Sequence, residues 1–133
     1  MINFIHFTEE KFRKAIKKLK NGKSPGPDGI PTELLKTFCD ELVAPLMVIY
    51  LDSLETGIFP EIWKKMFISP VKKPGKLKSK PESFRPVALT SHIGKVMEMI
   101  VTDELQTFLE NNNLLAKALH GFRRGRSCIS QLL

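Results

Sequence analysis

The stretch of residues 68–91, ISPVKKPGKLKSKPESFRPVALTS, restricts the possible folds of this chain more than any other feature. It begins and ends in short apolar runs, and a basic loop containing proline and glycine separates them. Residues of β-branched and aromatic type favour strands, whereas proline and glycine interrupt helices and mark turns. The pattern therefore predicts an antiparallel β-hairpin. The residues of strand character are Met66, Phe67, Ile68 and Val71 before the loop, and Phe84, Val87, Ala88 and Leu89 after it.

The predicted hairpin concentrates positive charge. Because side chains alternate between the two faces of a strand, Arg85 shares a face with Val87 and Leu89 and projects from a rigid element. A guanidinium group can donate a bidentate fork to phosphate oxygens. The sequence thus favours a triphosphate or a nucleic-acid backbone as ligand, although a solvated, lysine-rich turn is the alternative. The loop lysines, opposed only by Glu82, are Lys72, Lys73, Lys76, Lys78 and Lys80.

Charge is also segregated along the chain. The net charge is +7, from 21 basic and 14 acidic side chains among 133 residues. Residues 31–63 carry one basic and six acidic residues, whereas residues 64–86 carry eight basic and one acidic residue. Segregation of this kind favours a polyanionic partner, with nucleic acid ahead of a membrane surface. The longest apolar stretch, 42–51, contains Pro45 and is far shorter than the ~20 residues that span a bilayer.

The residue types that hold metals or disulfides are dispersed. Cys39 and Cys128 are far apart, and the histidines at 6, 92 and 120 do not cluster. We expect free thiols in an intracellular protein and no metal site. The carboxylates occur singly or as neighbours on helix surfaces, so no pair on one strand is predicted. The short apolar segment 2–7 does not fit a signal peptide.

Helical patterns dominate outside the hairpin. Thr8 is a plausible N-cap for a helix that reaches Leu19, and a second helix is expected at about 41–55, with Gly57 just beyond its end. A third helix, capped by Thr90 or Ser91, continues to the asparagines at 111–113. The residues predicted to form the apolar faces of the second and third helices are Leu42, Leu46, Ile49, Tyr50 and Leu54, and Ile93, Val96, Met97, Ile100, Leu105, Phe108 and Leu109. Trp63 is expected to pack against the second helix, with base stacking as the alternative.

Four segments occur in an order that is typical of one family. They are LKNGKSPGPDGIPTELLK (19–36), IFPEIWKKMFISPVKKPGK (58–76), SFRPVALTSHIGKVMEMIV (83–101) and LHGFRRGRSC (119–128). The chain resembles the amino-terminal part of a non-LTR, LINE-type retrotransposon reverse transcriptase. It departs from the usual pattern at Phe84, where the family has Tyr, and at Leu119, where the family often has Gln.

The resemblance implies an α+β fold: a mainly helical fingers subdomain, with helices packed around a small antiparallel β-hairpin and without the palm. It implies a helical amino-terminal extension at 1–57 and a fingers portion at 58–133 that stops before the catalytic palm. Reverse transcriptases use two magnesium ions held by palm aspartates downstream of the segment at 119–128. We therefore expect no catalytic residues, no metal site and no polymerisation from this chain alone, with Mg²⁺ required by the complete enzyme.

The resemblance also assigns sites. Lys73, Arg85 and Lys72 correspond to the elements expected to bind the dNTP. The residues expected to contact nucleic acid are Lys76, Gly26, Asp28, Gly29, Arg123, Arg124 and Arg126. For the turn at 24–31, the alternative is a helix-joining turn in which Asp28 is a local hydrogen-bond acceptor. For the arginines, the alternative is an exposed basic turn.

The implied partners are template RNA, primer DNA, dNTP and the palm portion of the same enzyme, with no membrane. The implied location is the nucleus. Two rival functions stay open at this point. One is an independent nucleic-acid-binding module, whose affinity falls steeply with salt. The other is a non-functional remnant of a mobile element, which neither binds nucleic acid nor unfolds cooperatively.

Overall fold

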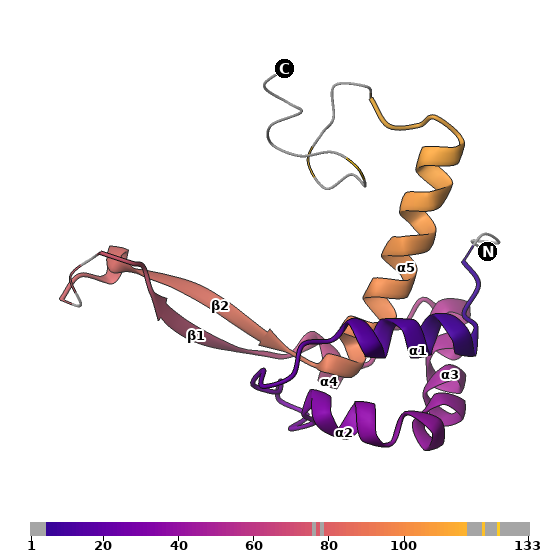
Figure 1. Cartoon of the computed structure of the whole chain (residues 1–133), viewed down its shortest axis with the longest axis horizontal. Helices are drawn as coiled ribbons and strands as arrows, with labels where there is room; N and C mark the ends of the chain where they lie inside the picture. The colour runs from indigo at the N-terminus through magenta and orange to yellow at the C-terminus, as the bar shows by residue number, and fades with distance from the viewer. Residues whose placement is uncertain (1–4, 76, 78, 117–120, 122–124, 126–133) are drawn as a thin grey trace.

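A helical body and a projecting hairpin make up the described part of the chain (Figure 1). The computed structural model describes residues 5–75, 77, 79–116, 121 and 125. The predicted contacts at Lys76, Arg123, Arg124 and Arg126 lie outside these residues. In chain order the elements are α1 (Glu9–Lys18), α2 (Thr32–Thr37), α3 (Cys39–Thr56), α4 (Glu61–Lys64), β1 (Met66–Lys72), a short 3-10 helix (Pro81–Ser83), β2 (Phe84–Thr90) and α5 (His92–Asn111).

The first helix, α1, begins where the sequence predicts. The Thr8 side chain accepts a hydrogen bond from the Lys11 backbone N–H at 3.3 Å, which satisfies one free donor of the first turn. Phe12 and Ile16, four residues apart, are buried on one face. The helix ends at Lys18, because Leu19 adopts an extended backbone conformation, and Gly22, the predicted stop signal, follows with a φ of 68°.

The long helix α3 differs from its prediction in two respects. It begins at Cys39 and not at about Glu41, so Pro45 lies inside the helix and beyond its first turn, where it removes one intrahelical hydrogen bond. Ile49 is 40% exposed, so its expected place on the buried face is wrong. The buried face of α3 instead includes Val43, Leu46, Tyr50 and Ser53. Gly57, with φ of 70°, ends the helix as predicted.

Tyr50 lies at the centre of the core. Its ring is fully buried, with centroids 5.5 Å from Phe7, 6.0 Å from Phe12 and 5.8 Å from Trp63. Its hydroxyl donates to the Ile93 carbonyl at 2.8 Å, which compensates for the burial of the polar group. Burial raises the pKa of the Tyr50 phenol, so the hydroxyl stays protonated. Trp63 is 8% exposed, which confirms that it packs against α3.

The predicted antiparallel hairpin is confirmed in position, and the structure adds its register. Strands β1 and β2 pair antiparallel from Met66 opposite Thr90 to Lys72 opposite Phe84. The hairpin projects from the body, however, so the expectation of helices packed around it is wrong (Figure 1). The physical reason lies in its two faces, since apolar side chains occur on both and no single face is apolar enough to require a helix over it. Phe67 on one face is 56% exposed and Ile68 on the other is 59% exposed.

The last helix, α5, has its fully buried side chains in its first half. Ser91 caps it by accepting a hydrogen bond from Gly94 N–H at 3.2 Å, and Val96, Met97 and Ile100 are buried as predicted. The carboxyl-terminal end of the helix extends beyond α1 (Figure 1). Leu105 and Phe108 are therefore 42% and 37% exposed, and their expected burial is wrong.

Two ion pairs join α5 to α1. Lys11 Nζ lies 2.8 Å from a Glu104 carboxylate oxygen, and Lys18 Nζ lies 3.2 Å from one of Asp103. The α5 carboxylates thus have structural partners in the body. Among the described residues, none of the helices is long and apolar enough to cross a membrane.

Candidate nucleic-acid interface

Lys73 is held at the point where the hairpin strands end. Its backbone N–H donates to the Ser83 carbonyl at 2.8 Å, which extends the strand pairing by one bond. Its ammonium donates to the Glu82 carbonyl at 3.0 Å and so reaches across to the opposite arm of the loop. Because an ammonium carries three donors, Lys73 keeps two for an approaching phosphate. Lys73 and the described loop residues 74, 75, 77 and 79–82 are exposed.

Arg85 and Lys72 lie near each other along the hairpin but face in opposite directions. Residues paired across antiparallel strands share a face, and Arg85 pairs with Val71, whereas Lys72 pairs with Phe84. Val71 and Lys72 are consecutive, so their side chains leave opposite faces. The structure therefore separates two of the three residues predicted for the dNTP. Both are exposed, and the ribbon carries positive charge on both sides.

The turn at Gly26–Gly29 lies at the other end of the hairpin. The Gly29 N–H donates to the Gly26 carbonyl at 3.0 Å, and the Ile30 N–H donates to Asp28 Oδ1 at 3.3 Å. Asp28 is therefore a local hydrogen-bond acceptor, as in the alternative interpretation of this turn. Asp28 Oδ2 also accepts a hydrogen bond from the Ser91 hydroxyl, 63 residues away in the chain. A contact of this range gives no signal in the sequence.

These positions form two separate groups. The turn contacts the chain at Ser91, where β2 ends, whereas Arg85 lies six residues earlier on the extended strand. At about 3.3 Å per residue, that separation is roughly 20 Å. The residues predicted for template contact and those predicted for the dNTP are thus not one cluster in this chain. A ligand that touches both groups has to be extended, as a nucleic-acid strand is.

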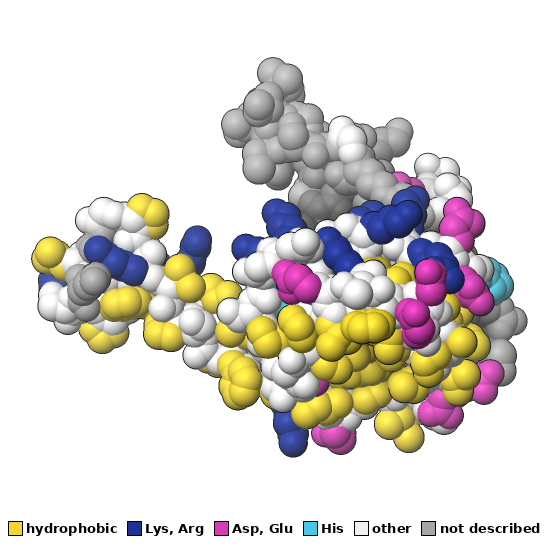
Figure 2. Space-filling model, turned by 60° about the horizontal axis from the view of Figure 1, so that its bottom comes forward, with side chains coloured by type: hydrophobic (Ala, Val, Ile, Leu, Met, Phe, Trp, Pro, Cys, Tyr) yellow, Lys and Arg dark blue, Asp and Glu magenta, His cyan; other side chains and the backbone are white. Residues whose placement is uncertain are grey.

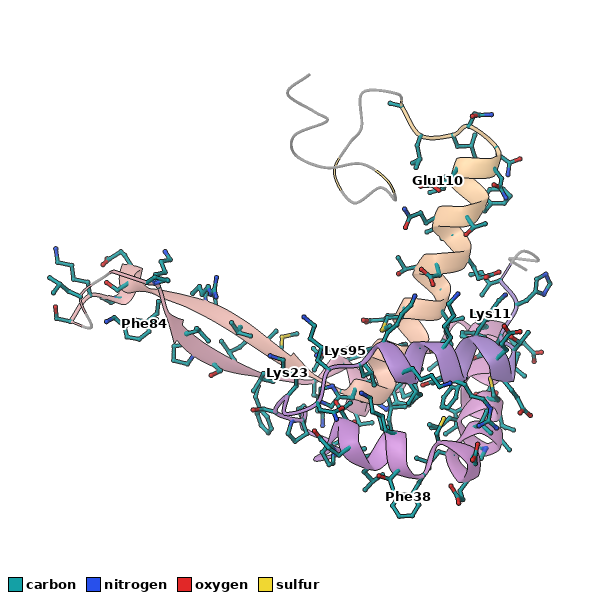
Figure 3. The ribbon with its side chains drawn as sticks, in the orientation of Figure 1. Lys11, Lys23, Phe38, Phe84, Lys95 and Glu110 are labelled. Carbon is teal, nitrogen blue, oxygen red and sulfur yellow. The ribbon has the colours of Figure 1, made fainter. Side chains whose placement is uncertain are left out.

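Further lysines stand near the base of the hairpin. Lys23 follows α1 and Lys95 lies in the first turn of α5, and Figure 3 places both at the end of the body from which the hairpin projects. The sequence analysis did not single out Lys23. Figure 2 shows Lys and Arg side chains on the hairpin and along one edge of the body. The basic surface therefore continues from the hairpin onto the body.

Several of the described carboxylates are paired with nearby donors within the body. Glu33 accepts a hydrogen bond from the Gly22 N–H at 2.6 Å, which lowers the pKa of the Glu33 carboxyl. Asp40 pairs with Arg13, and Glu61 pairs with Lys64, which lowers the pKa of the Glu61 carboxyl. Within the described ranges, no group of three or more His, Cys, Asp or Glu residues could hold a metal ion.

Comparison with known proteins gives relatives across nearly the whole chain, although no family model matches. The chain is 34% identical over 123 residues to the probable RNA-directed DNA polymerase from transposon BS of Drosophila melanogaster, which covers 92% of this chain and 14% of that protein. It is 30% identical over 125 residues to the RNA-directed DNA polymerase from mobile element jockey of the same species, which covers 94% of this chain and 14% of that protein.

The chain is homologous to non-LTR retrotransposon RNA-directed DNA polymerases. A third relative, the retrovirus-related Pol polyprotein from type-1 retrotransposable element R1 of Bradysia coprophila, is 32% identical over 92 residues, or 68% of this chain and 9% of that protein. The family resemblance seen in the four motifs is confirmed. This retrotransposon polymerase homologue spans only about 14% of the length of the first two relatives.

Proposed function

We propose that this chain is the fingers portion of a retrotransposon reverse transcriptase, which contacts template RNA and the incoming dNTP but does not catalyse polymerisation by itself. The observation that carries the proposal is the exposed basic hairpin inside a region homologous to such polymerases. A few charged residues of mixed sign would be sufficient to keep the chain in solution. Eight basic residues against one acidic residue at 64–86 favour a polyanion.

The geometry gives the hairpin residues different roles. Arg85, which projects from a paired strand, supplies a planar fork for phosphate oxygens. Lys73, anchored through Glu82, supplies a point charge at the end of the same strands. Because Lys72 is on the opposite face from Arg85, we assign Lys73 and Arg85 to the triphosphate and Lys72 to a nucleic-acid backbone.

The template contact proposed for the turn at Gly26–Gly29 is at the body end of the hairpin. Gly29 is exposed at the turn, where its backbone can approach an RNA strand closely. The contacts proposed for Lys76, Arg123, Arg124 and Arg126 rest on the resemblance alone. The proposed division into an extension at 1–57 and a fingers portion at 58–133 follows the motifs, although side chains from both ranges contribute to one core.

A binding experiment tests this proposal on the 133-residue chain. The Kd for a single-stranded RNA is measured by fluorescence anisotropy across a series of salt concentrations, for the unsubstituted chain and for Lys72→Gln, which removes the hairpin charge assigned to a nucleic-acid backbone. Each lost phosphate contact lowers the slope of log Kd against log salt concentration by about 0.7. We expect that reduction for Lys72→Gln. The matched control is Lys64→Gln, because Lys64 already pairs with Glu61 at 2.5 Å and should change the slope less.

The outcomes separate the candidate functions. RNA binding that is absent, or insensitive to salt, overturns the proposal, and absence together with non-cooperative unfolding indicates a remnant. Binding of a dNTP is titrated in parallel. Salt-dependent RNA binding together with no detectable dNTP binding favours the independent nucleic-acid-binding module. The magnesium of the complete enzyme does not enter this experiment, because the aspartates that hold it by resemblance lie outside this chain.

A further inference from the structure

Single residues join the projecting hairpin to the body. Lys65 stands between α4 and β1, and Ser91 stands between β2 and α5. The hairpin extends away from the helices, so the backbone at these two joints sets its direction (Figure 1). A strand of seven residues is about 23 Å long, so a rotation of about 10° at the joint moves the far end by roughly 4 Å. Small changes at Ser91 are therefore amplified at Arg85 and Lys73.

The joint at Ser91 is clamped by the turn at Gly26–Gly29. A Cβ atom on Gly26 would lie 2.5 Å from the Ser91 nitrogen and 2.5 Å from the Thr90 carbonyl carbon, so the two backbones are in direct contact. The Ser91 hydroxyl donates to Asp28 Oδ2 and accepts from the Gly94 N–H at 3.2 Å. One side chain thus connects the turn to the start of α5.

Asp28 is itself held in place. Its other oxygen, Oδ1, accepts the Ile30 N–H at 3.3 Å, and its side chain is half-buried. Its carboxylate lies beside the residue that caps the 20-residue helix α5, where a negative charge interacts favourably with the helix dipole. The same charge opposes close approach of a phosphate. The chemistry of Asp28 therefore suits an internal clamp better than a direct contact with RNA.

We infer that Asp28 is a positioning residue, which fixes the joint at Ser91 and thereby the direction of the basic hairpin relative to the body. The role of Asp28 in fixing the joint is inferred from the contacts above, whereas its effect on RNA binding rests on the proposed function. A hairpin held in one direction presents its basic side chains together with the body lysines Lys23 and Lys95 to one strand. RNA binding then costs less conformational entropy than it does when the hairpin moves freely about its joint.

Distance measurements between spin labels test the clamp directly. Labels are placed on the 133-residue chain at Leu77→Cys, 71% exposed in the hairpin loop, and at Val48→Cys, 68% exposed on α3. The native cysteines are replaced by serine. The distance distribution is compared for the otherwise unsubstituted chain and for Asp28→Ala, Asp28→Asn and the control Asp52→Ala, which removes an exposed carboxylate from α3.

We expect one narrow distribution for the parent chain and for Asp52→Ala, and a distribution at least about twice as wide for Asp28→Ala. Asp28→Asn keeps an amide oxygen that accepts from Ser91, so it should restore the narrow width. Circular dichroism verifies that each variant is folded. If Asp28→Ala does not fold, Asp28→Glu replaces it, because a longer side chain misplaces the carboxylate and should also widen the distribution.

RNA affinity, measured on the same variants without labels, separates this inference from the proposed function. We expect Asp28→Ala to weaken binding at least about threefold with an unchanged salt slope, since no phosphate contact is lost. A narrow distribution for folded Asp28→Ala, or a wide one with unchanged affinity, overturns the positioning role. If the parent chain does not bind RNA, the proposed function fails, and the distance distributions alone decide whether the clamp exists.

Discussion

Replacing Gly26 by alanine should be the most damaging single-methyl change in the Gly-Pro-Asp-Gly turn. The added Cβ would lie 2.5 Å from two backbone atoms and 2.8 Å from the Thr90 carbonyl oxygen. Ordinary Cβ contacts begin at 3.4 Å, so the turn must move away from the hairpin joint by 3.4 minus 2.5, or about 0.9 Å. Backbone on both sides of the contact leaves no flexible side chain to absorb the movement.

The movement has two costs. Overpacking of this kind costs about 1–3 kcal/mol, and stretching the Asp28–Ser91 hydrogen bond costs about 1 kcal/mol more. We therefore expect Gly26→Ala to lower the free energy of unfolding by about 2–4 kcal/mol. Gly29 is the matched control in the same turn. It has φ of 68° and no atom within 4 Å of an added Cβ, so Gly29→Ala should cost only about 1–2 kcal/mol of backbone strain.

Urea unfolding followed by circular dichroism measures both changes. Asparagine extends the comparison, because it tolerates positive φ: Gly29→Asn should recover most of the loss, whereas Gly26→Asn should be at least as damaging as Gly26→Ala. A Gly26→Ala variant with nearly unchanged stability would refute the close backbone contact. So would asparagine rescue at Gly26.

The remaining predictions concern the core and acid stability. Tyr50→Phe should lower the free energy of unfolding by about 1 kcal/mol in urea titrations, because the Ile93 carbonyl loses its donor, and an unchanged value would show that this bond is not stabilising. Trp63→Phe should lower the melting temperature yet leave RNA affinity within twofold of the parent value. A large loss of affinity in a folded variant would instead support base stacking by Trp63. The lowered pKa of Glu33 contributes stability above the ordinary glutamate value of 4.5, and this contribution is lost as the pH falls through the folded pKa. Glu33→Gln should therefore be less stable than the parent at pH 7, with the difference shrinking on acidification in melting curves, and a constant difference would contradict the hydrogen bond from Gly22.

Sequence patterns were most reliable where the determining interactions are local. Thr8 is predicted as one cap and either Thr90 or Ser91 as another, and in the structure Thr8 and Ser91 each accept a hydrogen bond from an N–H three residues away. The hairpin strands were predicted because proline, glycine and lysine separate two runs of strand-forming residues. The same patterns misplaced Ile49, Leu105 and Phe108, since helical periodicity defines an apolar face but not how much of that face another element covers.

The candidate site divides in the same way. Motif order in the sequence was sufficient to recognise homology to retrotransposon RNA-directed DNA polymerases, and the identities of the relatives confirm it. The roles of Lys72, Lys73 and Arg85 remain predictions. Their arrangement needed the strand register, which places Lys72 and Arg85 on opposite faces of the ribbon.

By itself, the sequence determined the three longest helices, the hairpin and the location of the positive charge, because caps, turns and charge runs act over a few residues. Only the tertiary structure decided that the hairpin projects from the body and that Asp28 holds its base through Ser91. Neither feature is encoded by local spacing. Both depend on which surfaces remain after Tyr50 and its neighbours have formed the core, and on backbone contacts between segments far apart in the chain.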